Sequence, residues 1–418
     1  MAENLANFFY MEHSWSMELA IVPRLHRRLR RAGGADPLQE KLARHVEQSV
    51  VAMLDPDRIE AMAEDMRLFE RKRVHHAGLV VCAFVLSAFE RSTDTEGRLL
   101  DARMTYEQLG GPPSGKGSFR RMAHKLLPVW HKLVRRRLHA LAQTAPEGEM
   151  RGRLVKLTDV LIPDGCAFKL ARALAGLYPG TGTVAELKLH AVYSVRTGAS
   201  LEDKRTAGSA TDTKTFWPQT WAKGALYLWD LGYQDNQRFV EATEAGAYVL
   251  QRLKEVSNPV VLASYGPAGE KLDVLHDDGT PVRIDEACEF GHVHRQDVLD
   301  LDVVIGDDKR LRRKVVARVV CVPYAGEDRY YLTTLPRTLF SAHDLAELYR
   351  MRWEVELLFR QWRGAMRMDE VRRLSNPKSL DLAITSSLLA ALLGRDIHAG
   401  LERLCREHAE TSATVPPS

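Results

Sequence analysis

The stretch LAELYRMRWEVELLFRQWRGAM, residues 345–366, decides which fold we expect for the rest of the chain. Its spacing predicts one helix with an apolar face and, beside it, a face where one carboxylate lies among basic residues and a phenol. Packing of the apolar face should hold the polar face in place, although a solvated helix with weak ion pairs has the same spacing. The apolar face consists of Leu348, Met351, Val355, Leu358, Phe359, Trp362 and Met366. The polar face consists of Tyr349, Arg352, Glu356, Arg360 and Arg363.

The length and composition of the chain indicate a globular protein with more than one domain. The chain has 418 residues, too many for one small core, and 45% of them are hydrophobic. A formal net charge of +4 permits a nucleic-acid partner without arguing for one. The five cysteines stand singly, which predicts a reduced, intracellular protein. We find no signal peptide and no apolar run of the ~20 residues that a membrane span needs, so no membrane partner is expected.

Residues 1–148 are expected to form a helical DNA-binding region. Two groups of basic residues favour this, although such groups are usually solvated faces. In TYEQLGGPPSGKGSFRRMAHKLL, residues 105–127, a helix, a Gly/Pro turn and a second helix starting near Ser118 form a helix-turn-helix-like pattern. This pattern would present Ser118, Arg120 and Arg121 to DNA phosphates. The basic groups are Arg24, Arg27, Arg28, Arg30 and Arg31, and Arg120, Arg121, Lys125, Lys132, Arg135, Arg136 and Arg137.

From residue 149 the pattern changes to strands followed by helices, which predicts the first part of an α/β domain over 149–256. Asp159 lies in or at the end of its first strand, and Asp230 directly follows its third. Open α/β sheets place their chemistry at such strand ends. Asp164, between Pro163 and Gly165, is expected in a turn, but the sequence leaves open whether Asp159 or Asp164 is the functional carboxylate. The expected strands are 154–162, 186–195, 225–229 and 247–253, with a helix at 236–245.

Residues 257–340 predict a β-rich insertion of short strands and turns, with no convincing helix. Within it, Asp300 and Asp302 alternate with apolar neighbours, as on the outward face of a strand. The second part of the α/β domain, 341–405, would then carry the helix of Glu356. Residues 406–418 should form a loose tail, and the apolar runs 77–89 and 382–394 should be buried helices.

Asp159, Asp230 and Glu356 form a candidate three-carboxylate site assembled from distant parts of the chain. Their hard oxygen atoms suit Mg²⁺ or Mn²⁺, which also accept phosphate oxygens. Two such ions ~3.5–4 Å apart would hold the attacking and leaving oxygens of an in-line displacement at phosphorus. Each carboxylate alone also fits an ordinary strand end or turn, so the assignment depends on the three meeting in space.

Four motifs resemble those of bacterial insertion-sequence transposases of the DDE class, insertion-sequence-four type. Tyr349, Arg352, Glu356 and Arg363 match the family's signature of Tyr, two residues, Arg, three residues, Glu, six residues and Lys, with Arg in the Lys place. LTDVLIP resembles the first acidic motif, LYLWDLGY the second, and YLTTLP is similar to the family's wording before the Glu helix. The first motif departs from the family, because Asp159 is not followed by Gly-Thr.

The resemblance implies an α/β fold: a ribonuclease-H-like catalytic domain with a β-rich insertion and a helical N-terminal DNA-binding region. It also implies that Asp159, Asp230 and Glu356 bind Mg²⁺ or Mn²⁺, as two ions. Tyr349 and Arg352 would contact phosphate near the transposon end, with Arg363 on backbone nearby. A phenol can hydrogen-bond a phosphate and an arginine can do so bidentately. The family further implies a homodimer on DNA in the bacterial cytoplasm.

The sequence therefore predicts a transposase that binds the inverted-repeat ends of its element, cuts DNA with metal-activated water and joins the freed 3′-hydroxyl to target DNA. Arg312, Arg313 and Lys314 of the insertion would add backbone contacts. One alternative is a DNA-binding regulator that has kept the fold and lost the chemistry, against which the three carboxylates speak. Another is a metal-dependent nuclease without strand transfer.

Overall fold

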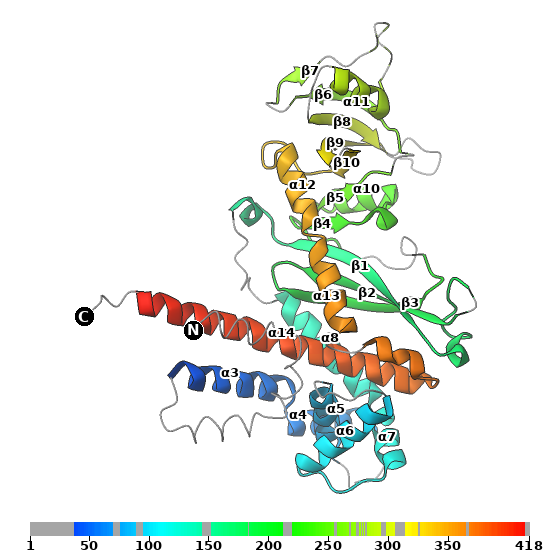
Figure 1. Cartoon of the computed structure of the whole chain (residues 1–418), viewed down its shortest axis with the longest axis vertical. Helices are drawn as coiled ribbons and strands as arrows, with labels where there is room; N and C mark the ends of the chain where they lie inside the picture. Colours follow the sequence, from blue (N-terminus) through cyan, green and yellow to red (C-terminus); the bar gives the residue numbers. More distant parts are fainter. Residues whose placement is uncertain are drawn as a thin grey trace. The chain divides into compact units, whose positions relative to one another are not determined.

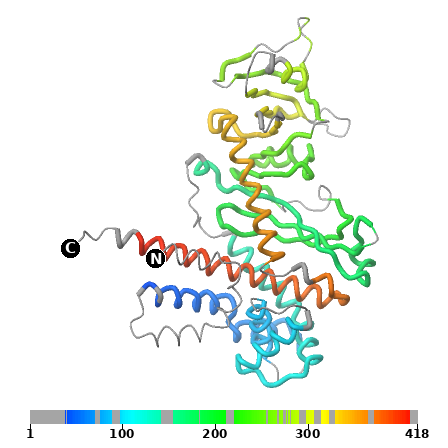
Figure 2. The backbone as a smooth tube through the Cα atoms, in the orientation of Figure 1, coloured from blue at the N-terminus to red at the C-terminus, as the bar shows by residue number. Residues whose placement is uncertain are grey.

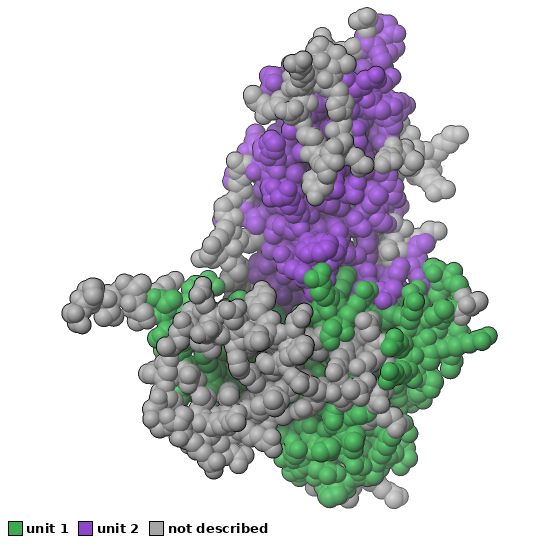
Figure 3. Space-filling view, viewed as in Figure 1, with its two compact units in different colours: residues 1–140, 168–187, 359–418 green, residues 141–167, 188–358 purple. Residues whose placement is uncertain are grey.

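A computed structural model of the chain shows two compact units, each assembled from separate segments (Figure 3). Unit 1 comprises residues 1–140, 168–187 and 359–418, and unit 2 comprises residues 141–167 and 188–358. These limits differ from those of the domains predicted from the sequence, because packing joins segments that lie far apart in the chain. The structure describes residues 37–69, 76–88, 95–143, 152–182, 184–211, 220–254, 257–266, 269–272, 276, 278, 280, 282–293, 298–305, 314–324, 327–364 and 368–413.

Some predicted features lie outside the described residues. These are the basic group from Arg24 to Arg31, Arg312 and Arg313 of the insertion, and Met366 of the apolar helix face. Among the residues that the structure does describe, no helix combines the length and the apolar character that crossing a membrane would require.

Unit 1 is helical. The long helix α14 packs on α3, α5 and α7 (Figure 2). α5 and the first half of α14 are buried, which confirms the two helices predicted from the apolar runs. The helices of this part of the chain are α3 (Pro37–Met53), α4 (Pro56–Asp65), α5 (Ala77–Ser87), α6 (Thr95–Gln108), α7 (Lys116–Lys125), α8 (Leu127–Gln143) and α14 (Pro377–Ala413).

The predicted helix, turn and helix are present as α6, residues 109–115 and α7. Gly110 turns the chain after α6 with a φ of 94°, a conformation that side chains with a Cβ rarely adopt. α7 begins at Lys116, two residues before the predicted start, and buries Phe119 against Phe84 and Tyr106. The three side chains predicted to face DNA, Ser118, Arg120 and Arg121, are all exposed.

The prediction of a loose tail from residue 406 is wrong as far as Ala413, because α14 continues to that residue. No proline or glycine lies between Leu401 and Ala413, and Leu401 and Leu404 continue the apolar spacing. Leu401 is only 8% exposed. The helix therefore has packing at this point and no breaker to end it.

A ten-stranded sheet runs through unit 2, in the order β3-β2-β1-β4-β5-β10-β9-β8-β6-β7 (Figure 1). β1 pairs with β4 and β4 with β5 in parallel, whereas β5, β10, β9, β8, β6 and β7 pair in antiparallel fashion. The strands are β1 (Val160–Lys169), β2 (Glu186–Ser194), β3 (Ala199–Ala207), β4 (Leu226–Trp229), β5 (Tyr248–Arg252), β6 (Val260–Tyr265), β7 (Lys271–Leu272), β8 (Leu299–Ile305), β9 (Val315–Tyr324) and β10 (Glu327–Thr333).

The first strand lies further along the chain than predicted. Residues 152–156 form a 3-10 turn, and β1 starts at Val160, so Asp159 precedes the strand and Asp164 lies inside it rather than in a turn. Pro163 does not interrupt the ladder with β4, because the residues that pair there, Val160 and Leu161, come before it. Gly165 fits because a Cβ there would lie 2.9 Å from His190 Nδ1.

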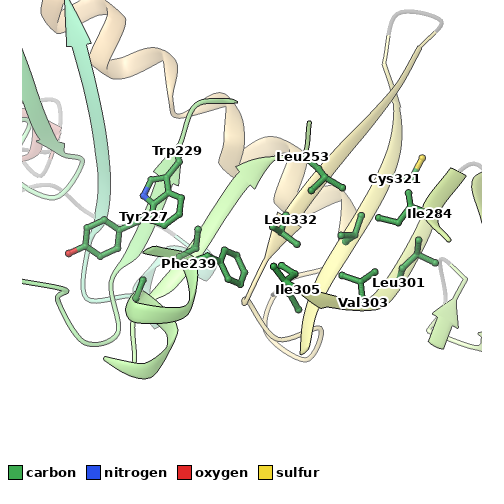
Figure 4. Close-up of a cluster of buried hydrophobic side chains, with 14 of the residues drawn as sticks. Tyr227, Trp229, Phe239, Leu253, Ile284, Leu301, Val303, Ile305, Cys321 and Leu332 are labelled. Carbon is green, nitrogen blue, oxygen red and sulfur yellow. The ribbon is translucent and has the colours of Figure 1, made fainter. Parts of the chain in front are cut away.

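The predicted insertion continues the main sheet, since its last strand, β10, pairs directly with β5. It also contains a helix that was not predicted, α11 (Ile284–Val293), which buries Ile284, Ala287 and Cys288. Together with α10 (Asn236–Glu244), α11 covers one face of the sheet. Figure 4 shows the resulting core, in which Tyr227, Trp229 and Phe239 continue into Leu301, Val303 and Cys321.

The opposite face of the sheet is covered by α12 (Ala342–Arg350) and the loop before it. Asp300 was predicted to face outward, but it is only 7% exposed. Arg318 Nε donates to both Asp300 oxygens at 2.8 and 2.9 Å, and Arg318 Nη1 donates to the Phe340 carbonyl at 2.8 Å. Arg337 adds ion pairs to Asp300 and Asp302. The outward face is therefore buried by the chain that leads into α12.

The predicted single helix over 345–366 is interrupted. α12 starts with a capping box formed by Ser341 and Asp344 and ends at Arg350, and α13 runs from Trp353 to Arg363. Between them, Arg352 N–H donates to the Tyr349 carbonyl at 3.1 Å, an i to i−3 bond of a tighter turn. No proline or glycine marks this break. The apolar face is otherwise confirmed, since Leu348, Val355, Phe359 and Trp362 are buried.

Candidate active site

Arg352 lies among three carboxylates of unit 2, and each of its three nitrogens faces a different one. Nη2 donates to Glu356 Oε1 at 2.6 Å, Nη1 lies 3.6 Å from Asp164 Oδ2, and Nε lies 3.8 Å from Asp230 Oδ1. The Arg352 side chain is 20% exposed. The break between α12 and α13 thus delivers one guanidinium to acids from three separate elements.

The sheet and α13 position these acids. Asp164 is held in β1, and Asp230 follows β4, the parallel neighbour of β1, so both lie toward the same edge of the sheet. Glu356 stands in the first turn of α13, where a carboxylate also favours the positive end of the helix dipole. Asp230 and Glu356 are 45% and 33% exposed, whereas Asp164 is 19% exposed.

Burial raises the pKa of Asp164 to about 6. The Gly165 N–H and Arg352 act in the opposite direction, and the negative charges of Asp230 and Glu356 raise the pKa further. Burial alone would lower the pKa of Arg352, but the hydrogen bond to Glu356 and the charge of Asp230 outweigh it and raise that pKa. Three carboxylates thus share one cation, and burial is the main reason that the pKa of Asp164 is raised.

Tyr349 contacts the end of β4 and the loop residue Asp230. Its hydroxyl lies 3.2 Å from the Trp229 carbonyl and 3.5 Å from Asp230 Oδ1, and its ring packs on Tyr331. Burial and then the charge of Asp230 raise the pKa of Tyr349 well above its ordinary value. The phenol is therefore a neutral donor directed at Asp230 and its strand. Its predicted contact with DNA phosphate stays a prediction.

Asp159 has a different environment, although it is only 5% exposed. Ser194 Oγ donates to its Oδ2 at 2.6 Å, and the Val160 and Arg196 N–H groups donate to its Oδ1 at 2.7 and 3.1 Å. Arg196 Nε also lies 3.5 Å from Oδ2. Both oxygens are thus used to tie the start of β1 to the turn between β2 and β3.

The other predicted DNA-binding residues are exposed. Ser118, Arg120, Arg121, Arg360 and Arg363 belong to unit 1, and Lys314 belongs to unit 2. The Arg363 guanidinium lies 5.8 Å above the Phe168 ring.

The acids around Arg352 have the donor chemistry of a divalent-metal site. Carboxylate oxygens are the ligands of Mg²⁺ and Mn²⁺, and Asp164, Asp230 and Glu356 each direct a carboxylate toward Arg352. Within the described part of the chain, no three acidic, histidine or cysteine side chains are gathered closely enough to hold an ion. The guanidinium lies between them, so the residues fit a metal in their chemistry, and Arg352 would have to move for them to share one.

Sequence reasoning favoured Asp159 and read Asp164 as a turn residue, because Pro163 and Gly165 flank it. The sequence also holds a signal that favours Asp164: the pair Asp164-Gly165 matches the Asp-Gly start of the family's usual first motif better than Asp159-Val160 does. The position of Arg352 between the acids had no signal, since it depends on a break that the spacing does not show.

Comparison with known proteins gives consistent matches. Residues 157–393 match the family model of the transposase DDE domain. The chain is 20% identical over 393 residues to the transposase of insertion sequence element IS231B from Bacillus thuringiensis subsp. berliner, covering 85% of this chain and 78% of that protein. It is 21% identical over 392 residues to the IS231F transposase from Bacillus thuringiensis subsp. israelensis, covering 85% and 80%. A 66-residue segment is 38% identical to the putative transposase InsL of IS186A from Escherichia coli strain K12, covering 16% and 18%.

Proposed function

This chain belongs to the transposase DDE-domain family, whose enzymes cut and join DNA by phosphoryl transfer, and from that premise we propose that Asp164, Asp230 and Glu356 hold its catalytic metal. The observation that carries this proposal is the set of contacts of one guanidinium, Arg352, with all three acids. The family depends on a divalent metal, and the all-oxygen donor set favours Mg²⁺ or Mn²⁺, with two ions for two-oxygen chemistry at phosphorus.

Asp164 takes the place first given to Asp159 for a physical reason. A metal ligand needs a lone pair directed away from the protein's own donors, and the oxygens of Asp159 receive four contacts from Ser194, Val160 and Arg196. Asp164 receives the Gly165 N–H and the longer contact to Arg352. Moving Arg352 would therefore free Asp164 and would leave Asp159 as it is.

Asp164, Asp230 and Glu356 would hold the metal, which would activate water for attack and stabilise the charge that develops on phosphate oxygens. The chain's own residues orient the site. Tyr349 holds Asp230 through its hydroxyl, and the capping box at Ser341 fixes the start of α12, which carries Tyr349. Arg352, once released from Glu356, can offer a bidentate fork to the scissile phosphate. Arg352 thus neutralises the acids in the absence of DNA and binds the scissile phosphate when DNA is present.

The proposed substrate is double-stranded DNA, comprising the inverted-repeat ends of the element and a target site. Exposed basic residues of α7, namely Arg120 and Arg121, together with Arg360, Arg363 and Lys314, would neutralise backbone phosphates. We propose a homodimer on DNA, because two ends must be held for joining, and action in the bacterial cytoplasm, where that DNA lies.

The test uses DNA that carries the sequences flanking the coding region, incubated with Mg²⁺ or Mn²⁺. The D164N, D230N and E356Q variants should each lose more than about 100-fold of the cleavage and joining rate, since a ligand contributes at least as much as its supporting contacts. All three should keep the DNA affinity of the wild type. Removal of the metal by EDTA should abolish both steps and leave binding in place.

The D159N variant is the matched control, because it makes the same change five residues away. It should keep cleavage and lower the midpoint of thermal unfolding, as expected for a buried carboxylate that receives several hydrogen bonds. If D159N loses cleavage and D164N keeps normal activity, Asp159 rather than Asp164 is the first metal ligand. Cleavage without joining would identify a nuclease, and binding without either step would identify a regulator.

A further inference from the structure

Unit 1 contains a cavity of about 240 Å³ that none of the three proposed metal-binding carboxylates lines. Its walls come from α5, α6, α7, the short segment before α14, and the first turns of α14. Phe84, Leu99, Leu374 and Leu382 line it with apolar surface.

The polar side of this cavity is basic. Arg98, Arg120 and Arg373 line it from three different elements, together with hydroxyl groups of Ser375, Ser379 and Ser386. None of the described residues that line it carries a carboxylate. Arg98 Nη2 also donates to Ser387 Oγ at 3.0 Å, which fixes this guanidinium beside the cavity. Three guanidinium groups and three hydroxyl groups in one lining suit an anionic ligand, because all of them can donate to its oxygens.

His124 lies beside the same basic residues. Its Nε2 lies 3.0 Å from Ser379 Oγ in the cavity wall. Burial lowers the pKa of His124, and the positive charges of Arg120 and Lys378 lower it further. The histidine therefore stays neutral in the free protein, and an anion placed beside it would oppose that effect.

The volume limits what can enter. Pockets for whole small-molecule ligands usually measure ~300–1,000 Å³, so this cavity admits a part of a ligand rather than a complete cofactor. A phosphate satisfies the guanidinium and hydroxyl donors, and an attached sugar satisfies the apolar wall. One phosphodiester with its deoxyribose is a group of this size and character.

We propose that this cavity, the Arg98–Arg120–Arg373 pocket, binds one backbone phosphodiester of DNA. The proposal rests on the proposed function, which supplies DNA as the ligand. A polymer is favoured over a free phosphate because Arg120 and its neighbour Arg121 also face solvent on α7, where adjacent phosphates of the same strand can be contacted. The pocket thus sets the position of DNA on unit 1.

The test measures the affinity of the full chain for a fluorescein-labelled 40-base-pair duplex at several salt concentrations. The R373Q variant should weaken binding about 10-fold, as expected for loss of a hydrogen-bonded charge pair. The slope of log K against log salt should fall by about 1, because one fewer phosphate is neutralised. Arg373 is exposed, so its replacement should leave the unfolding midpoint unchanged.

The R372Q variant is the matched control. Arg372 precedes Arg373, is also exposed and does not line the cavity, so its replacement should change affinity and slope much less. A second variant, A383L, keeps every charge and narrows the cavity. It should weaken binding as R373Q does, with the circular dichroism spectrum of the wild type.

Equal affinities for the wild type, R373Q and R372Q would overturn the pocket while leaving the proposed function in place, provided that metal-dependent cleavage persists. Calorimetric titration with inorganic phosphate tests whether the pocket binds a free phosphate instead of a DNA phosphodiester. If R373Q abolishes phosphate binding and leaves duplex affinity unchanged, the pocket serves a small phosphate ligand and the DNA assignment is wrong. Failure of the wild type to bind any duplex would instead refute the proposed function.

Discussion

Asp159 and Asp164 illustrate what a sequence can specify about a single residue. Both are acids near the start of the same strand, and local pattern favoured the first because the second stands between proline and glycine. The structure separates them by their partners, since Asp159 accepts from Ser194 and Arg196 whereas Asp164 faces Arg352. Those partners come from other elements, so the residues next to Asp159 and Asp164 in the sequence contain no information about them. The places of Asp230 and Glu356 in the fold were predictable, because Asp230 follows a strand and Glu356 lies on a helix that their own neighbours define.

The stability of the protein should depend on the ionisation of Asp164. Its folded-state pKa is about 6, above the ordinary value of 3.8, so the folded state binds the proton more tightly than the unfolded state does. Stability from this group is present below pH ~4 and is lost as the pH rises through about 6, by ~3 kcal/mol at most. In EDTA, D164N should therefore gain thermal stability over the wild type between pH 4.5 and pH 7.5. Parallel curves for the two proteins would contradict the raised pKa.

Replacement of Tyr349 by phenylalanine should distinguish two roles of its hydroxyl. If it positions Asp230, as the 3.5 Å contact indicates, Y349F should lower the cleavage rate about 10-fold with DNA affinity unchanged. If the hydroxyl instead binds phosphate, duplex affinity should fall with the rate. Cleavage at saturating DNA and fluorescence anisotropy measure the two quantities. We expect the first result, because the side chain of Tyr349 is buried.

Among the elements, those with strong local periodicity were predicted and those defined by tertiary packing were not. β2, β4, β5 and α10 lie within a residue or two of their expected limits. α11 was missed because it is short and lies between turn signals, and because only Ile284, Ala287 and Cys288 are buried among its residues 284–289, whose burial the structure describes. The break after α12 and the burial of Asp300 also depend on contacts between distant segments, so periodicity does not predict either.

The ion pair between Arg318 on β9 and Asp300 on β8 should be a major contributor to the stability of the sheet. Both side chains are less than a tenth exposed, and their contact is bidentate, from Arg318 Nε to Asp300 Oδ1 and from Nη2 to Oδ2. In D300A, the buried guanidinium of Arg318 keeps only its contacts with backbone carbonyls. The variant should therefore lower the free energy of unfolding by ~3–5 kcal/mol. The double variant D300L with R318M should cost less than D300A, since no uncompensated charge stays buried. Denaturant unfolding of the three proteins checks the order.

At the scale of the whole molecule, the fold class was predictable and the grouping of segments was not. The family implies a ribonuclease-H-like α/β fold, and the mixed sheet with helices on both faces agrees with it. The sequence placed a boundary near residue 148, yet the N-terminal helices pack on α14 from the other end of the chain. Packing between segments that are hundreds of residues apart cannot be predicted from the local sequence of either segment.

A chain shortened after residue 376 should therefore lose unit 1. α14 packs on α3, α5 and α7, and its removal would expose the apolar surface of α5, which is buried on nearly every residue. We expect aggregation, or loss of helical circular dichroism beyond the share of α14 itself. A chain shortened after Ala413, which keeps α14, should behave as the full chain. A soluble and fully helical N-terminal part without α14 would show that this region folds alone.

The same three-segment assembly has a consequence during protein synthesis. α14 begins about 230 residues after α8 ends, so at ~5–20 residues per second the ribosome needs roughly 10–50 s to deliver it. Throughout that interval the apolar helix α5 has left the ribosome, whereas α14, which packs on it in the folded protein, has not yet been made. A nascent chain in this state is prone to aggregation and is a substrate for chaperones, and faster translation of the segment between α8 and α14 should improve the yield of folded protein.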